Sequence, residues 1–229
     1  AAALVGLIFL LGPPISEAWT NKAYGAHFVY RWQLDDPTWI TRTVAWTCYT
    51  AHQLSMWWLI YYAQSKKLRY SNKLHRVNVA ALLLNLGFIL LHIAQSHTFY
   101  DGIAQDVHEG TALGSVTLML VLILLMENNH RGMFFGTRMP ISKRVTDWVR
   151  RYHGYYFSWA IVYTVWYHPT AITIGHLAGF AYMFLLLLQS SLFFTRMHVN
   201  RWWKFTLEAI VVVHGTTVAW AVDMDTGNT

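Results

Sequence analysis

Long runs of apolar residues alternate along this chain with short polar connections, and this pattern is the first guide to its fold. A helix needs about 20 apolar residues to cross the hydrocarbon core of a bilayer, and several runs approach that length. Seven spans are expected, at 1–11, 43–63, 77–97, 111–126, 155–167, 172–194 and 205–222. The pattern therefore predicts an all-α, polytopic membrane helical bundle, with residues 1–229 forming one transmembrane domain.

The first run, 1–11, is short for a membrane span, and Pro13 and Pro14 follow it directly. Proline ends a helix because it lacks the amide hydrogen and its ring clashes with the preceding turn. We interpret the run as a truncated first transmembrane helix rather than as the apolar part of a signal sequence. Without this run the bundle has six spans.

Composition supports membrane insertion, because 55% of the residues are hydrophobic and only 12% are charged. A soluble domain has about 25% charged residues. Twelve tryptophans and thirteen tyrosines are typical of proteins whose aromatic side chains lie at the two membrane–water interfaces. The bilayer is therefore the expected surrounding of this chain.

The net charge of +6 comes from basic residues in the short connections between spans. This distribution fits the positive-inside rule and gives no sign of a nucleic-acid partner. The connection at 128–151 has six arginines and lysines, so it is predicted to be a basic loop on the cytoplasmic side, or the organellar equivalent. The N-terminus would then lie inside and the C-terminus outside.

Several functional classes lack their sequence signatures. Cys48 is the single cysteine, which excludes a disulfide framework and a thiolate metal site. The chain has no Walker sequence, dinucleotide fingerprint or serine-nucleophile motif. ATP-driven transport, nicotinamide binding and serine hydrolysis are therefore without support.

Histidines are the most informative polar residues, because ionisable groups at membrane depth mark functional sites. Those predicted at the outer face are His92, His97, His108, His168 and His176; His52 and His214 fall near mid-membrane, and His27 in the first outer loop. At the inner face, His75, His130 and His198 lie among arginines and lysines. We expect these three to be solvated or to contact lipid headgroups, while the role of His153, at the start of a span, stays open.

Polar stripes on two predicted helices point into the bundle. Asn78, Asn85 and His92 are spaced by seven residues and so share one helix face. Cys48, His52 and Ser55, at spacings of four and three, also share a face. Ordinary hydrogen bonds between helices would also explain these stripes. Glu208, an acid inside the last span, is expected to pair with a base on a neighbouring helix or to contact a proton path or a quinone.

Two neutral imidazoles from different helices at the same depth are a common means of holding a b-type haem. His92 and His176 both lie about five residues inside the outer ends of their spans, so they form the preferred pair. His52 and His214 form the second predicted pair, nearer the middle. Glycines that would permit close approach of a porphyrin are Gly87, Gly154, Gly175 and Gly179.

With these histidines on its spans, the chain resembles the transmembrane b-type haem proteins of the ferric-reductase-like and cytochrome b561-like families. Those families place histidine pairs on helices so that two haems stack across the membrane. Their spacing within a helix is thirteen or fourteen residues; here His153 and His168 are fifteen apart, and His198 and His214 sixteen. The resemblance implies electron transfer through haem b, with a quinone or another membrane subunit as partner.

Two alternatives remain open. The histidines at 92, 97, 108, 168 and 176, with Asp101, Asp106 and Glu109 nearby, would suit copper, zinc or non-haem iron, as in a membrane metal oxidoreductase. The second alternative is a non-catalytic subunit whose histidines hold pigment, lipid or partner helices. The sequence therefore leaves open whether the protein is an enzyme.

Overall fold

The computed structural model describes residues 1–11, 38–98, 103–133, 135–170, 172 and 174–226. These residues form seven α-helices, one short 3-10 turn (η1, Ile103–Gln105) and no strand. The helices are α1 (Ala2–Leu11), α3 (Trp39–Ser65), α4 (Arg76–Thr98), α5 (Glu109–Arg131), α6 (Lys143–Tyr167), α7 (Ile174–Ser191) and α8 (Arg201–Thr226). The predicted all-α fold is confirmed. Pro13, Pro14, His27 and Asp101 lie outside the described residues.

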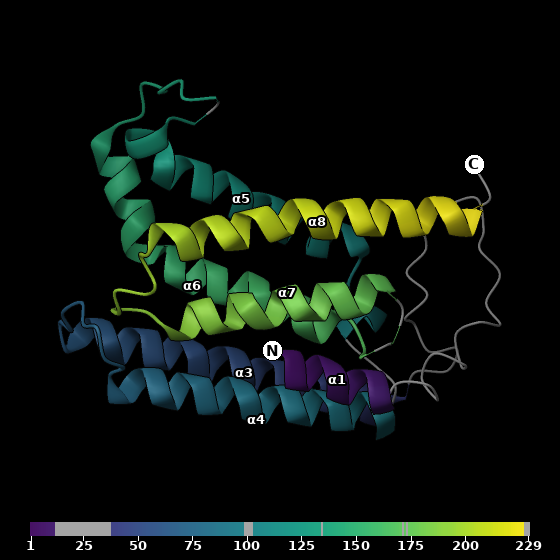
Figure 1. Cartoon of the computed structure of the whole chain (residues 1–229). Helices are drawn as coiled ribbons and strands as arrows, with labels where there is room; N and C mark the ends of the chain where they lie inside the picture. The colour runs from purple at the N-terminus through teal and green to yellow at the C-terminus, as the bar shows by residue number, and fades with distance from the viewer. Residues whose placement is uncertain (12–37, 99–102, 134, 171, 173, 227–229) are drawn as a thin grey trace.

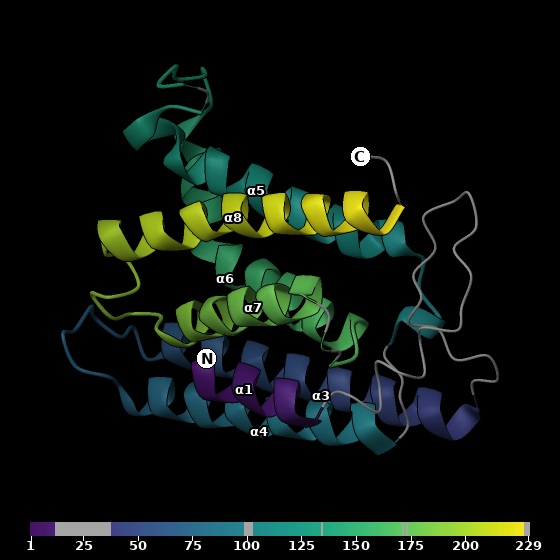
Figure 2. The ribbon, with the colours of Figure 1, turned by 45° about the vertical axis from the view of Figure 1, so that its right-hand side comes forward.

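The helices pack in three layers (Figures 1 and 2). Helices α3 and α4 pack together in one outer layer, α6 and α7 form the middle layer, and α5 and α8 lie on the opposite side. Within this arrangement α6 contacts α3, α5 and α7, while α7 contacts α4, α6, α8 and the short α1. Helix α6 is therefore central, and any group that it carries can meet side chains from several other helices.

The predicted spans coincide with helices, although the span 172–194 extends past both ends of α7. Among the described residues, three helices are long and apolar enough to cross a membrane by length and composition. These are 76–98, 110–131 and 174–191, fewer than the seven predicted spans. Helix α1 has only ten residues, which extend about 15 Å. Helices α3, α6 and α8 have 27, 25 and 26 residues. They are long enough to cross a membrane, but their polar residues make them less apolar than the three helices named above.

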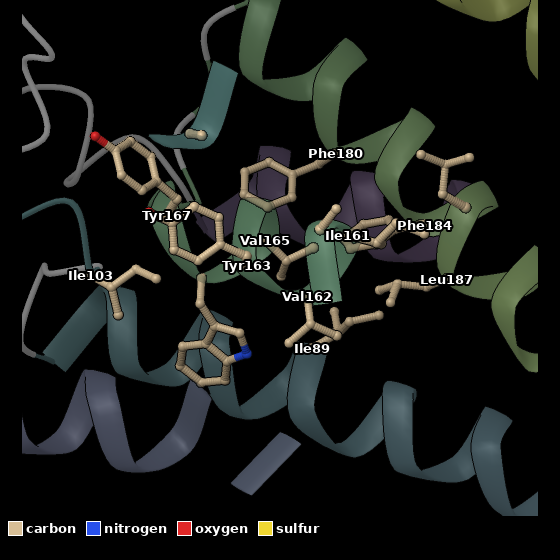
Figure 3. Close-up of a cluster of buried hydrophobic side chains, with 14 of the residues drawn as sticks. Ile89, Ile103, Ile161, Val162, Tyr163, Val165, Tyr167, Phe180, Phe184 and Leu187 are labelled. Carbon is tan, nitrogen blue, oxygen red and sulfur yellow. The ribbon is translucent and has the colours of Figure 1, made fainter. Parts of the chain in front are cut away.

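The core of the bundle lies between the middle layer and its neighbours (Figure 3). One face of α6 contributes Val162, Tyr163 and Val165, which are at most 4% exposed. Phe180 and Phe184 from α7 pack against the same cluster. These side chains are almost fully enclosed by protein, so His92 and His176, whose rings lie near Phe180, border an apolar interior.

The connections α3–α4, α5–α6 and α7–α8 lie at the same end of the helices, on the left in Figure 1. Two backbone hydrogen bonds join the first and last of them, from Ser71 N to Phe194 O (3.1 Å) and from Arg196 N to Ser71 O (2.8 Å). We call this the basic end, because these connections and the adjoining helix ends carry most of the arginines and lysines. Its position on the cytoplasmic side stays a prediction.

The predicted basic loop 128–151 is largely helical. Helix α5 continues to Arg131, and α6 begins at Lys143 after the N-cap Ser142, whose side chain accepts a hydrogen bond from Arg144 N (3.3 Å). Thr146 and Val149 are buried, so this stretch of α6 is amphipathic and packs on the protein despite its charges. The connection itself is therefore only 132–142.

Candidate functional site

Helix α6 carries two histidines, His153 in its first half and His168 as its C-cap. They are fifteen residues apart, which corresponds to about 22 Å along a helix. His153 lies toward the basic end and His168 at the opposite end. Each is in contact with a second histidine from another part of the chain.

At the basic end, the rings of His153 and His198 lie 6.3 Å apart between centroids, with an interplanar angle of 33°. We call these two residues the basic-end pair. His198 lies in the connection between α7 and α8, and both side chains are partly buried. The prediction that His198 is solvated or contacts lipid headgroups is wrong, because the connection folds back and places this ring against α6.

The orientation of His198 is fixed mainly by Gln189 near the end of α7. The ring Nδ1–H donates to the Gln189 carbonyl (3.0 Å), and the Gln189 side-chain amide donates to the His198 carbonyl (3.1 Å). The Trp203 indole donates to the Gln189 side-chain oxygen (2.6 Å), and the His198 amide donates to Thr195 Oγ1 (3.3 Å). The imidazole is therefore held from several sides.

The hydrogen bonds of the basic-end pair also define which ring nitrogen has the lone pair. His153 Nδ1 contacts the Arg150 carbonyl at 2.7 Å. A carbonyl can only accept, so Nδ1 is protonated in both rings and each Nε2 has the lone pair. Histidines that bind metals commonly donate Nδ1–H to a backbone carbonyl in this way.

Burial lowers the pKa of His198 to about 4, with a further lowering by the charges of His153 and Lys204; the hydrogen bond to the Gln189 carbonyl acts in the opposite direction. The ring is therefore neutral at physiological pH. A neutral imidazole is the form that ligates a metal.

At the other end of α6, the rings of His168 and His176 lie 6.0 Å apart at an angle of 73°. We call them the acidic-end pair. His168 Nδ1–H donates to the Thr164 carbonyl (3.0 Å), and His92 Nε2–H donates to the His168 carbonyl (2.8 Å). His92 from α4 thereby fixes the backbone at which α6 ends.

The predicted pair His92 and His176 meets only indirectly. The ring of Phe180 lies 6.3 Å from that of His92 and 6.5 Å from that of His176. The depth argument correctly placed both histidines in one region, but the structure puts His168 beside His176 and Phe180 beside both. Their role as haem ligands stays a prediction.

His52 has a complete set of hydrogen bonds inside the bundle. Its Nδ1 accepts from the Trp166 indole (3.2 Å), so its Nε2 is protonated and donates to Asn85 Oδ1 (2.7 Å). The Asn85 amide donates in turn to Ser191 Oγ (2.8 Å), and Phe88 stacks on the imidazole at 4.5 Å. This chain of bonds joins α3, α4, α6 and α7, which is the interhelical role that the polar stripes allowed.

His214, the predicted partner of His52, lies on α8, in the layer opposite α3. Its ring approaches Tyr182 (6.3 Å), and a Cβ added at Gly179 would meet it at 3.4 Å. Gly179 therefore permits close approach of an imidazole to α7. Among the contacts of the described residues, none joins His214 to His52, and this pair also stays a prediction.

Two histidines of the alternative metal site have local roles. His97 bonds to the Ile93 carbonyl (2.7 Å) and to the Leu11 carbonyl, and His108 caps α5 by accepting from Gly110 N (3.0 Å). Within the described ranges, no group of three or more histidine, cysteine or acidic side chains is placed to hold an ion. Because Asp101 is not described, copper, zinc or non-haem iron at this site stays a prediction.

Glu208 on α8 pairs with a base on a neighbouring helix, one of the two predicted roles. Arg131 at the end of α5 donates to both of its oxygens, at 2.9 and 2.7 Å. Glu127 joins the same cluster through Arg131 (3.3 Å) and Lys204 (3.0 Å). These ion pairs tie α5 to α8 near the basic end.

The comparisons with known proteins give no further guide to this site. No family model, no curated protein and no solved structure matches the chain. The functional argument therefore rests on the histidines and their surroundings.

Proposed function

We propose that this protein is an integral membrane electron carrier that holds haem b through histidines at the two ends of α6. The observation that carries the proposal is the basic-end pair. His153 and His198 come from separate elements, have matching tautomers and lie in ring contact. Only an irregular connection, fixed by Gln189 and Thr195, brings the second imidazole there.

The donor set of the basic-end pair fits a haem iron. His153 and His198 would hold the iron through their two Nε2 atoms, since imidazole is a common ligand of haem iron. The centroids of His153 and His198 are 6.3 Å apart. The Nδ1–H of each ring already donates to a backbone carbonyl, which leaves Nε2 as the nitrogen for ligation.

The acidic-end pair supports a second site of the same kind at the far end of α6. His168 and His176 come from α6 and α7, and their ring centroids are 6.0 Å apart, so these two imidazoles would be the ligands there. His92 acts here as a positioning residue, because it holds the His168 carbonyl. When bound, haem iron supplies one-electron chemistry; the protein supplies imidazoles, an apolar surrounding and orientation.

Transport of electrons across a bilayer requires that α6 crosses it. Helices α3 and α8 have 27 and 26 residues, more than the roughly 20 that a span needs. The part of α6 that follows its charged start, residues 152–167, extends about 24 Å. Buried polar residues such as Gln53 and Ser158 face the interior of the bundle. We propose that these helices cross the membrane with α4, α5 and α7, and that α1 belongs to a seventh span.

The test is the haem content of purified variants. His198→Ala and His153→Ala should each lower the haem-to-protein ratio. His75→Ala, at the same end and with its ring against the nearby Arg69 carbonyl, should leave it unchanged. His198→Met should retain haem with an altered spectrum, because methionine can ligate haem iron. Full haem content in both alanine variants would refute ligation by the basic-end pair.

Two other outcomes would support the alternatives. A colourless protein with stoichiometric copper, zinc or iron would favour a membrane metal oxidoreductase. A colourless and metal-free protein would favour a non-catalytic subunit that binds pigment, lipid or partner helices. A quinone or another membrane subunit is the proposed redox partner, and added quinone analogues should alter the reoxidation rate of the reduced protein.

A further inference from the structure

A second region of the basic end has the chemistry of a binding site and lies apart from the histidine pairs. A pocket of about 300 Å³ opens where the end of α5 meets the start of α8. Its lining residues are Glu127, His130, Arg131, Arg201 and Lys204. We call it the α5–α8 pocket.

The charges around this pocket leave one cation without an acidic partner. Arg131 pairs with Glu208 and Glu127, and Lys204 pairs with Glu127, so two carboxylates offset two of the three cations. Arg201 has no carboxylate partner among the described residues; its guanidinium lies over the Trp202 ring at 5.2 Å. The pocket therefore has an excess of about one positive charge, located at Arg201.

The level of the pocket relative to the membrane indicates where its ligand would come from. Arg131 is the last residue of an apolar stretch long enough to cross a membrane, so the pocket lies at the level of the headgroups. On α8, Trp202 and Phe205 are 66% and 59% exposed. Large exposed aromatic side chains beside a cationic group are typical of a surface that contacts lipid at the interface.

We propose that the α5–α8 pocket binds the phosphodiester headgroup of an anionic phospholipid. A phosphodiester has one negative charge, which matches the excess at Arg201, and guanidinium groups bind phosphate oxygens through paired hydrogen bonds. The exposed Trp202 and Phe205 would contact the glycerol and the upper acyl chain. Free phosphate offers the same oxygens but nothing for these aromatic side chains to contact.

The test measures lipid bound to the purified full chain in mild detergent, by native mass spectrometry, after addition of phosphatidylglycerol or phosphatidylcholine. We expect preferential retention of phosphatidylglycerol. Arg201→Ala should weaken it about tenfold, the effect of losing a hydrogen bond to a charged group, while Arg201→Lys should retain most of it. Lys73→Ala, an exposed basic-end variant, is the matched control.

Folding is separable from binding, because the Arg201 guanidinium lies over the exposed Trp202 ring and has no carboxylate partner among the described residues. Thermal stability in detergent should therefore be unchanged in Arg201→Ala. Equal retention of the two lipids, or equal retention by wild type and Arg201→Ala, would overturn the proposal. Displacement of the lipid by millimolar inorganic phosphate, with direct binding of that phosphate, would assign the pocket to a free anion instead. Loss of lipid binding in Lys73→Ala would show that the binding depends on general surface charge, and this result would also overturn the proposal.

Discussion

Asn85→Ala tests the hydrogen-bonded chain that joins four helices in the bundle core. Asn85 is 4% exposed and is the only residue of that chain in contact with both His52 and Ser191. Its removal orphans the His52 Nε2–H inside the protein, which costs about 2 kcal/mol. The lost bond to Ser191 Oγ and the small cavity add about 1 kcal/mol. We therefore expect a loss of about 3 kcal/mol.

The assay is reversible unfolding of the purified protein in mixed micelles, followed by tryptophan fluorescence. Leu83→Ala on the same helix is the control, because Leu83 is 63% exposed and its truncation should change stability by less than about 0.5 kcal/mol. Asn85→Asp should recover most of the loss, since a protonated carboxyl group can accept from His52 and donate to Ser191. A cost for Asn85→Ala no larger than that for Leu83→Ala would refute this reasoning.

Three further predictions concern pH, ion pairing and topology. Because the pKa of His198 is lowered to about 4 in the folded protein, the unfolded chain binds more protons than the folded chain between pH 6.5 and 4. The free energy of unfolding should therefore fall by at most about 3 kcal/mol as the pH decreases across that window. In unfolding measurements at a series of pH values, His198→Phe should lose this dependence. Glu208→Gln should leave the fold intact and cost about 1 kcal/mol or less in the same unfolding assay, because its partner Arg131 is half exposed; a collapse of expression would contradict this. In a Cys48→Ser background, Lys73→Cys should react with a membrane-impermeant maleimide only after the membrane is opened, and labelling of intact cells would contradict the predicted orientation.

The sequence predicted the helices well, because apolar periodicity and length depend on local composition. It overestimated the number of independently apolar spans, since α6 begins with a charged, amphipathic stretch that packs through Thr146 and Val149. It also identified the interior stripe of Asn85 and His92. Both are buried, at 4% and 1% exposed, as their shared helix face required.

The pairing of the histidines could not be read from depth alone. His198 looked solvated because its neighbours in sequence are basic; only the fold of the α7–α8 connection, bonded to Ser71 and Gln189, places it against His153. A weak signal was available, since Gln189 follows a long apolar run in which a polar side chain needs a partner. Similarly, the contact of the α6 C-cap His168 with His176 is a tertiary feature.

The most direct test of the proposed function is a visible spectrum of the purified wild-type protein, oxidised and then reduced with dithionite. Two histidine ligands on one iron give a six-coordinate, low-spin haem in both states. The proposal therefore predicts a Soret band with a sharp α band on reduction, and little change when carbon monoxide is added. Absence of a Soret band would contradict haem binding, and a reduced spectrum that shifts at once with carbon monoxide would contradict ligation by two histidines.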